Sequence, residues 1–441
     1  MRAVIVSILC FLFLLTLATP DITWMNTNGD SPLFVYAAQN WGISHPTGQP
    51  LYTIISAILV HLIPSTNPFW LLAILSAAFA SATAYVLYRL THSVIAPILY
   101  TVAGVVISQA TIPEIYTTVT FFMVLAYYFY TQRKLKRTAL ALSLALAVHH
   151  LAIFMAAGIL LREWWMKKPI GKMLLITLSG GLWYAYIPLT TIWHPVHQMD
   201  LLGTEQGIGR FIRYFFSQGM VPLGISPLSQ DMVNRLGDYT VVMLGSLSVI
   251  APLAIWYMIK MWKRKDRLLL VLVILISLWY MLDLDPNTYT YLVPAIALVA
   301  IVVATQVTKF TLPLVYGALL VLPVIGLLAY DIDRNLDPTP TTARQFLTQL
   351  ETLPEGSTVF TYNRGWEWLT TRLGGVHSEQ TPFLVALDDY PEGLCEKENL
   401  YATSVQDKAT LSVSIVPLKC ASNNLISVES SSSNNRNAPT N

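Results

Sequence analysis

Charged residues are scarce in this chain of 441 residues: 12% of the residues are charged, whereas 54% are apolar. Soluble domains carry roughly 25% charged residues. No Lys or Arg occurs from Ala3 to Tyr88, and the only carboxylates before Arg162 are Asp21, Asp30 and Glu114. This shortage excludes an ordinary soluble protein. Together with recurring apolar runs, it predicts an α-helical, polytopic membrane protein.

Cysteine, basic tails and metal-binding motifs are also rare or absent. Of the three cysteines, Cys10 lies in the first apolar run, whereas Cys395 and Cys420 would form a disulfide only in an oxidising compartment. The sequence leaves that pairing open. Without a basic patch, nucleic acid is not an expected partner. No HExxH or CxxC spacing occurs, so we predict neither a metal site nor a cofactor, although a need for a divalent cation stays open.

The apolar runs predict about eleven transmembrane helices. Segments near the length of a bilayer span occur at 3–19, 68–88, 93–110, 115–131, 138–149, 151–165, 173–192, 238–259, 268–282, 288–307 and 311–329. If the chain starts in the cytoplasm, sixteen Lys and Arg residues fall in inside loops and only Arg210, Arg213 and Arg235 fall outside. The positive-inside rule therefore favours this orientation and an extracytoplasmic C-terminal part. Residues 1–20 also resemble a secretory signal, but we favour an uncleaved helix.

This orientation requires that the apolar run 51–63 does not cross the membrane. We predict that the first outer loop contains two interfacial helices instead. One would run from Pro32 to about Trp41, with Ser31 as its cap, and the other would start near Pro50. His45-Pro46 would separate them. Glu114, the His149-His150 pair and the loop 193–236 would reach the same outer face.

Composition predicts three parts. Residues 1–330 form the transmembrane domain, with eleven acidic and nineteen basic residues. Residues 331–420 resemble a small soluble α/β domain on the extracytoplasmic side, because helical and strand-like segments alternate there. The segment 331–441 holds fourteen acidic and eight basic residues, and its Ser- and Asn-rich end, 421–441, is predicted to be disordered.

Ionisable residues near a membrane are costly, so the few that remain are functional candidates. Asp30 is the first of them: at a helix N-terminus its ionised form is favoured, and it could accept a proton from a hydroxyl. The alternative is that Asp30 only caps the helix. Glu114 could likewise contact a substrate or cap the helix that follows it, whereas Asp21 is more typical of an interfacial residue.

Histidine and arginine supply the remaining polar groups. His45, His149 and His150 could hydrogen-bond an anionic group, or they could be ordinary structural histidines. Arg210 and Arg213 are spaced three apart and could hold a phosphate, or they could face lipid headgroups on an amphipathic helix.

Several of these residues lie in motifs that resemble a known family. Asp30-Ser31 followed by the block from Gly42 to Tyr52 (GISHPTGQPLY) resembles the first-loop signature of GT-C membrane glycosyltransferases, in the branch similar to protein O-mannosyltransferases. Three shorter elements also resemble that branch: Pro113-Glu114-Ile115-Tyr116, His149-His150 and Tyr186-Ile187-Pro188-Leu189. The chain departs from the family at Leu33, where an acidic residue is usual, at Thr47, where a second proline is usual, and at Tyr289–Pro294, which lacks an arginine.

The resemblance implies an inverting glycosyltransferase that moves a sugar, with mannose one candidate, from a polyprenyl-phosphate donor to a protein or glycan hydroxyl outside a cytoplasmic or ER-type membrane. Asp30 would be the catalytic base. The residues implied to bind donor or acceptor are His45, Tyr52, Glu114, Tyr116, His149, His150, Arg210 and Arg213. Two other classes compete: a flippase or transporter of lipid-linked sugars, which the lack of a repeat and of midplane charges disfavours, and a non-catalytic membrane assembly protein.

Overall fold

The computed structural model is predominantly helical and divides into two compact units. Unit 1 contains Met1–Pro20 and Ala37–Leu336, and unit 2 contains Asp21–Tyr36 and Asp337–Asn441. The structure describes residues 1–22, 30–44, 48–193, 230–247, 250–262, 267–282, 288–309, 311–329, 342–354, 357–361, 377–380, 400–407, 412–421 and 424–427. Thus Asp21 and Asp30, which we had included in the transmembrane domain 1–330, fall in unit 2.

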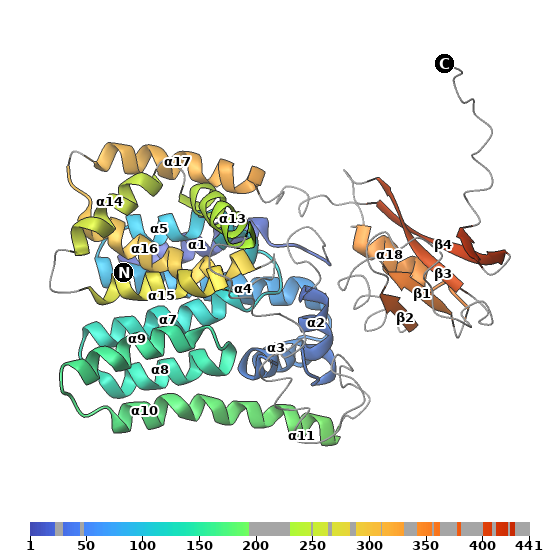
Figure 1. Ribbon diagram of the computed structural model, residues 1–441, viewed down its shortest axis with the longest axis horizontal. Helices are drawn as coiled ribbons and strands as arrows, with labels where there is room; N and C mark the ends of the chain where they lie inside the picture. Colours follow the sequence, from blue (N-terminus) through green and yellow to red (C-terminus); the bar gives the residue numbers. More distant parts are fainter. Residues whose placement is uncertain are drawn as a thin grey trace, which may run out of the picture. The chain divides into compact units, whose positions relative to one another are not determined.

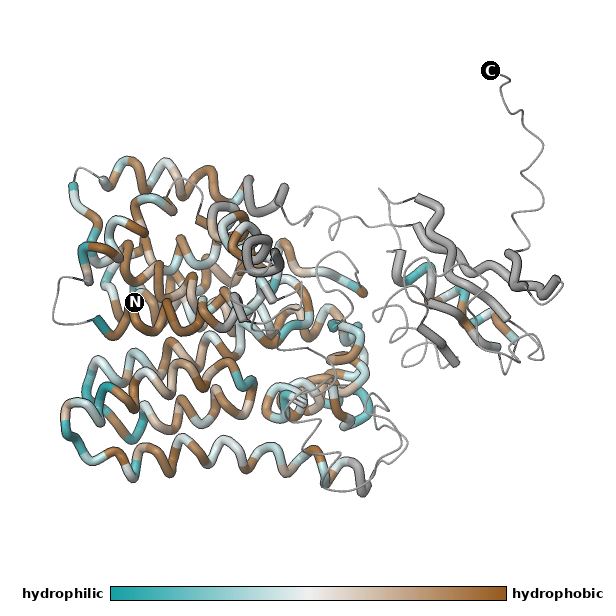
Figure 2. Tube along the Cα trace, viewed as in Figure 1, coloured by the Kyte–Doolittle hydropathy of each residue, from teal (hydrophilic) through white to brown (hydrophobic). Residues whose placement is uncertain are grey.

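Unit 1 is built from apolar helices (Figures 1 and 2). Its first half contains α1 (Arg2–Leu17), α3 (Pro50–Leu62), α4 (Pro68–Thr91), α5 (Ile95–Val102), α6 (Gly104–Ala110), α7 (Tyr116–Thr131), α8 (Leu135–Val148) and α9 (Ala152–Trp165). Its second half contains α10 (Gly171–Leu178), η1 (Ser179–Ala185), α11 (Tyr186–Trp193), α13 (Gln230–Leu247), α14 (Ile250–Trp262), α15 (Leu268–Leu282), η3 (Thr288–Leu292), α16 (Val293–Gln306) and α17 (Leu312–Ala329). Helix α2 (Asp30–Asn40) contributes residues to both units.

Helix α16 lies at the centre of unit 1. Its residues from Val293 to Val303 are all buried, and it packs against α5, α7 and α15. Helix α4 packs against both α1 and α7, while α8 lies between α7 and α10. Helix α1 instead exposes a row of apolar residues, as expected for side chains that contact lipid: Val4, Ile5, Ile8, Leu9 and Leu12.

The lengths of the described helices support fewer transmembrane spans than the eleven that the apolar runs predict. Among the described residues, three continuous helical segments are long and apolar enough to cross a membrane: Pro68–Thr91, Gly171–Thr190 and Tyr289–Gln306. A fourth would be the pair α13 and α14, which meet at a bend of 103°. Shorter apolar helices cover Arg2–Leu17, Pro50–Leu62, Leu268–Leu278 and Leu312–Val324. The number eleven therefore stays a prediction.

Two of the predicted spans are not continuous helices. The run 93–110 is divided into α5 and α6, because the backbone of Ala103 is extended (φ −66°, ψ 129°). The run 238–259 is divided between α13 and α14. Uniform apolar composition does not reveal such breaks, since a hydrophobicity average registers the side chains and not the backbone angles.

The described C-terminal residues of unit 2 comprise α18 (Thr342–Leu350) and five strands: β1 (Thr358–Thr361), β2 (His377–Gln380), β3 (Leu400–Asp407), β4 (Ser412–Ala421) and β5 (Asn424–Ser427). The strand order is β2-β1-β3-β4-β5. Strand β1 is parallel to β2 and β3, whereas β3–β4 and β4–β5 are antiparallel. The disordered tail predicted from residue 421 therefore starts too early, because Asn424–Ser427 pairs with β4. Cys395 lies outside the described residues, so its pairing with Cys420 stays open.

Candidate functional site

Asp30 is the first residue of α2 and is partly buried. The helix starts two residues earlier than predicted, so Ser31 is a buried residue of the first turn rather than a cap. The positive end of the helix dipole favours a negative charge at this position. The following turns bury Leu33 and Phe34, which fixes the first turn and with it the Asp30 backbone. The geometry suits an ionised carboxylate, as a base requires.

The segment after α2 has an unusual backbone. Trp41, Gly48 and Gln49 all have positive φ, at 50°, 94° and 36°. Only glycine adopts such angles without cost, and strained residues of this kind cluster at functional sites. Gln49 is fully buried; its side-chain oxygen accepts a short hydrogen bond from Ser44, and its backbone carbonyl accepts the N–H of Thr53 in α3. Helix α3 then starts at Pro50, as predicted.

Tyr186 joins two of the sequence motifs. Its hydroxyl donates to the backbone carbonyl of Trp41 at 2.8 Å and contacts that of Gly42 at 3.2 Å. The Trp41 ring lies 5.3 Å from the ring of His61, between centroids. The block Gly42–Tyr52 and the Tyr186–Leu189 motif, 134 or more residues apart, are therefore one structural feature. We had quoted Tyr186 only as part of a motif and not as a site residue.

Glu114 lies between α6 and α7 and is 2% exposed. The Ser76 hydroxyl of α4 donates to its carbonyl and accepts its N–H, each at 3.1 Å. One carboxylate oxygen, Oε2, accepts the N–H of Ile115 at 3.2 Å. Because Ile115 is itself the N-cap of α7, this bond contacts the start of the helix but does not satisfy an N–H group of its first turn. The backbone clamp nevertheless holds this carboxylate in a defined place.

Tyr52 of α3 lies near this carboxylate and is 1% exposed. Burial first, and then the negative charge of Glu114, raise the pKa of the Tyr52 hydroxyl. The hydroxyl therefore stays protonated and can donate a hydrogen bond. The structure thus brings together Tyr52 and Glu114, two residues that the resemblance assigns to substrate binding.

His149 lies between two tyrosine rings. The centroid of its ring is 5.8 Å from that of Tyr116 and 5.7 Å from that of Tyr291, and the two tyrosines are 5.6 Å apart. The His150 ring stacks on His149 at 4.1 Å. Three of these residues were predicted, but Tyr291 was not. It belongs to the segment Tyr289–Pro294, whose only sequence signal was a missing arginine.

The hydrogen bonds of His149 define its tautomer. The backbone N–H of Leu151 donates to Nδ1 at 3.1 Å, so Nδ1 carries a lone pair and not a proton. In a neutral imidazole the proton is then on Nε2, which is a donor. His149 ends α8 in an extended conformation and is 2% exposed. This rigid, buried donor suits an anionic or hydroxyl oxygen.

The remaining predicted site residues, His45, Arg210 and Arg213, lie outside the described residues. So does most of the loop 193–236 that would contain the two arginines. Within the described part of the chain, no three His, Cys, Asp or Glu residues gather in a way that could hold a metal ion. The site roles therefore stay predictions, whereas the contacts of Tyr52, Glu114, Tyr116, His149 and His150 are defined.

Comparison with known proteins supports the resemblance. Residues 30–100 match the family model described as the protein O-mannosyl-transferase TMEM260 N-terminal domain. This match begins at Asp30 and covers the first-loop block and α4. The resemblance to O-mannosyltransferase-like GT-C enzymes is thereby confirmed. No curated protein matches the chain.

Solved structures show the fold. The chain is similar to ArnT from Cupriavidus metallidurans bound to undecaprenyl phosphate, with a TM-score of 0.56 and 11% identity over 96% of this chain and 98% of ArnT. The apo state of the same protein gives a TM-score of 0.57 and 10% identity over 86% of this chain and 84% of ArnT. At such identity the likeness concerns the fold alone.

Proposed function

We propose that this chain is an inverting glycosyltransferase that moves a sugar from a polyprenyl-phosphate donor to an acceptor hydroxyl on the outer face of the membrane. The family-model match that begins at Asp30 carries this proposal. The ArnT structure bound to undecaprenyl phosphate supports the class of donor. A protein or glycan hydroxyl is the acceptor, and mannose is the sugar that the family name favours.

In this reaction Asp30 takes the proton of the acceptor hydroxyl. The acceptor oxygen then forms a bond to the anomeric carbon, and the bond from that carbon to the phosphate oxygen breaks. The bonding electrons leave with the phosphate, and attack from the opposite face inverts the anomeric centre. The protein has to supply a base for the proton and donors for the charge that develops on the phosphate.

The buried donors of unit 1 fit the second requirement. His149 presents Nε2–H, while the Tyr116 and Tyr291 rings restrict the imidazole. His150, Arg210 and Arg213 would also offset phosphate charge. Glu114 and His45 would orient the sugar or the acceptor, and Tyr52 would donate its hydroxyl proton beside Glu114.

An apolar cavity in unit 1 fits part of the donor's isoprenoid tail. Its volume is about 580 Å³. It is lined by residues of α13, α14 and α15: Leu236, Tyr239, Ile255, Met258, Ile259, Leu270, Val273, Ile274, Ser277 and Leu278. Its two hydroxyl groups, those of Tyr239 and Ser277, hydrogen-bond each other at 3.2 Å, so the lining offers an apolar surface to a lipid chain.

The same proposal includes the membrane arrangement. Eleven spans would place the first outer loop, the start of α7 and the His149-His150 turn on the extracytoplasmic side. Residues 331–420 would form a small α/β domain there and would bind acceptor or shield the site.

Sugar transfer in isolated membranes tests the function. Membranes that contain the wild-type chain, Asp30→Asn or Glu114→Gln are supplied with radiolabelled polyprenyl-phosphate sugars. We expect Asp30→Asn to lose about 10²-fold or more, as for removal of a general base. Glu351→Gln is the matched control, because it also exchanges a carboxylate for an amide in unit 2, at an exposed position. Full activity of Asp30→Asn would refute its role as the base, and a chain without any transfer would favour an assembly protein.

A further inference from the structure

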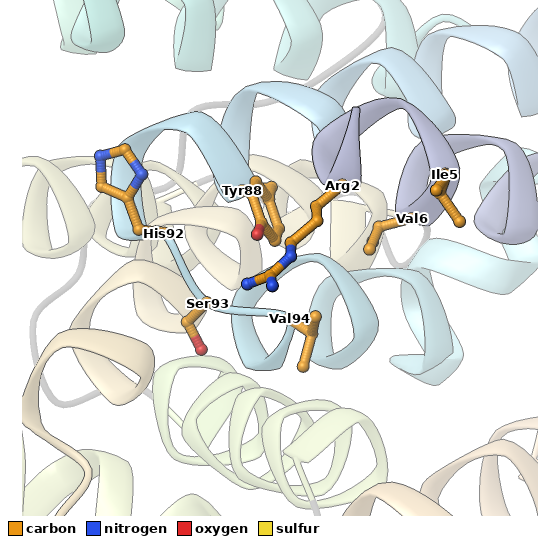
Figure 3. Close-up of a pocket in the computed structure, with 7 residues that line it drawn as sticks. All are labelled: Arg2, Ile5, Val6, Tyr88, His92, Ser93 and Val94. Atoms are coloured by element: carbon orange, nitrogen blue, oxygen red, sulfur yellow. The ribbon is translucent and has the colours of Figure 1, made fainter.

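A second cavity lies at the start of α1 (Figure 3). Its volume is about 410 Å³. It is lined by residues from the first turns of α1, from the last turn of α4 and from the segment that joins α4 to α5: Arg2, Ile5, Val6, Tyr88, His92, Ser93 and Val94. In Figure 3 the Arg2 side chain extends toward Ser93, the Tyr88 hydroxyl lies beside it, and His92 stands at the far side.

Hydrogen bonds between α1 and α4 define the position of this cavity in unit 1. Ser7 and Ser81 exchange hydrogen bonds, with each hydroxyl donating to the other's carbonyl at 2.8 and 2.7 Å. Helices α1 and α4 therefore run antiparallel, which brings Arg2 near Tyr88. At the other end of α1, the N–H of Thr19 donates to the carbonyl of Thr111 at 2.8 Å, close to Glu114 in sequence. The cavity and the Glu114 region thus lie at opposite ends of α1, about 24 Å apart at 1.5 Å per residue.

The charge of the cavity is positive. None of the described acidic residues lines it, and Glu163 is paired with Arg133 at 3.2 Å. The C-terminal end of α4 contributes only about −0.5 charge, which the guanidinium of Arg2 exceeds. Arg89, which is also in the last turn of α4, donates to the Tyr85 hydroxyl at 2.8 Å and does not line the cavity. Arg2 is therefore available to an anion.

The apolar part of the lining continues into a lipid-facing surface. Ile5 and Val94 are exposed at the rim. From there, exposed apolar residues follow one side of α1 toward its other end: Val4, Ile5, Ile8, Leu9 and Leu12. A ligand with one anionic end and long apolar chains could bind Arg2 with its anionic end and pack its chains against the exposed apolar residues of α1. Tyrosine beside a base is also typical of the membrane–water interface.

We propose that this cavity binds the phosphodiester headgroup of an anionic membrane lipid, with its acyl chains along α1. Arg2 bonds the phosphate oxygens, Tyr88 and Ser93 offer hydroxyl groups, and His92 closes the far side. Basic pockets between transmembrane helices bind lipid headgroups in this manner. The site is separate from the proposed donor site, because it lies at the opposite end of α1.

Lipid titration of the purified full-length chain in neutral detergent tests the proposal. Phosphatidylglycerol and phosphatidylcholine with identical acyl chains are compared, and bound lipid is counted by native mass spectrometry. We expect the wild type to bind phosphatidylglycerol about tenfold more tightly, as for one charge-assisted hydrogen bond. Arg2→Gln and His92→Gln should each reduce this preference, and Arg2→Lys should retain part of it.

Arg89→Gln is the matched control, since it removes a base of the same end of α4 that does not line the cavity. It should keep the preference for phosphatidylglycerol, as should Asp30→Asn. An unchanged preference in Arg2→Gln, or an equal loss in Arg89→Gln, would overturn the proposal. Glycerol 1-phosphate separates the sources of phosphate: if it competes as well as the lipid, the cavity binds free phosphate and the acyl chains have no role.

Discussion

Arg344 of α18 forms a two-point ion pair with Asp21, which follows α1 in the sequence. Its Nε donates to Oδ2 at 2.8 Å and its Nη2 donates to Oδ1 at 2.6 Å. The hydrogen bonds to Asp21 raise the pKa of the Arg344 guanidinium. Asp21 therefore has a structural partner 323 residues away, which explains its place in unit 2 with the C-terminal part of the chain.

Breaking the Asp21–Arg344 pair is expected to destabilise unit 2. Both side chains are partly exposed, 26% for Asp21 and 37% for Arg344, so the coupling should be about 1 kcal/mol. Asp21→Asn, Arg344→Gln and the double variant form a thermodynamic cycle, followed by protease susceptibility of the C-terminal part. Arg344→Lys should lose most of the coupling, because an ammonium group lacks the planar fork. Strictly additive effects in the cycle would show that the pair contributes nothing.

Tyr186→Phe is expected to impair catalysis more than stability. The substitution removes the hydroxyl that holds the Trp41 and Gly42 carbonyls, while the ring remains. We expect sugar transfer to fall about tenfold and the free energy of unfolding to fall by about 1 kcal/mol. Tyr184→Phe is the matched control, since its hydroxyl also donates to a carbonyl, that of Leu146 at 3.2 Å. If both variants lose activity equally, the contact of Tyr186 with the Trp41 and Gly42 carbonyls has no specific role in sugar transfer.

Ser76→Ala is expected to destabilise the Glu114 turn. Ser76 makes two hydrogen bonds to the Glu114 backbone from a fully buried position. Leaving that N–H and carbonyl without these bonds should cost about 1–3 kcal/mol. Ser81→Ala, in the same helix, removes bonds to Ser7 and serves as the comparison. Thermal unfolding of both proteins measures stability, and only Ser76→Ala should also raise the KM for the donor. An unchanged KM would show that Glu114 has only a structural role at the start of α7.

The sequence predicted helices well where a long apolar run has one secondary structure. The run 115–131 corresponds to α7, the run 268–282 to α15 and the run 311–329 to α17. It also predicted the start of α3 at Pro50, because proline favours the first turn of a helix. The sequence indicates the helix break at His149 but not the one at Ala103. The polar pair at 149–150 marks an interruption, whereas an extended alanine inside an apolar run leaves no trace in composition.

Contacts over long separations account for what the sequence did not predict in the site. Tyr291 packs on His149 and Tyr116 although it is 142 and 175 residues away, and no local pattern encodes that meeting. Tyr186 reaches Trp41 across 145 residues in the same way. The motifs did include Tyr116, His149 and His150, whose rings the structure brings together. Helix packing determines which of these side chains are in contact.

Two substitutions at His149 separate its two nitrogens. In His149→Asn the amide oxygen can replace Nδ1 and accept the N–H of Leu151, but no group reaches the position of Nε2. In His149→Gln the amide nitrogen replaces Nε2, while the acceptor for Leu151 is lost. If Nε2–H stabilises charge on the departing phosphate, His149→Asn should lower kcat roughly 10²-fold, whereas His149→Gln should retain most of it. Stability should follow the opposite order, with His149→Gln less stable by about 1 kcal/mol. Single-turnover transfer and thermal unfolding measure the two effects, and equal kcat values for the two variants would reject a catalytic donor at Nε2.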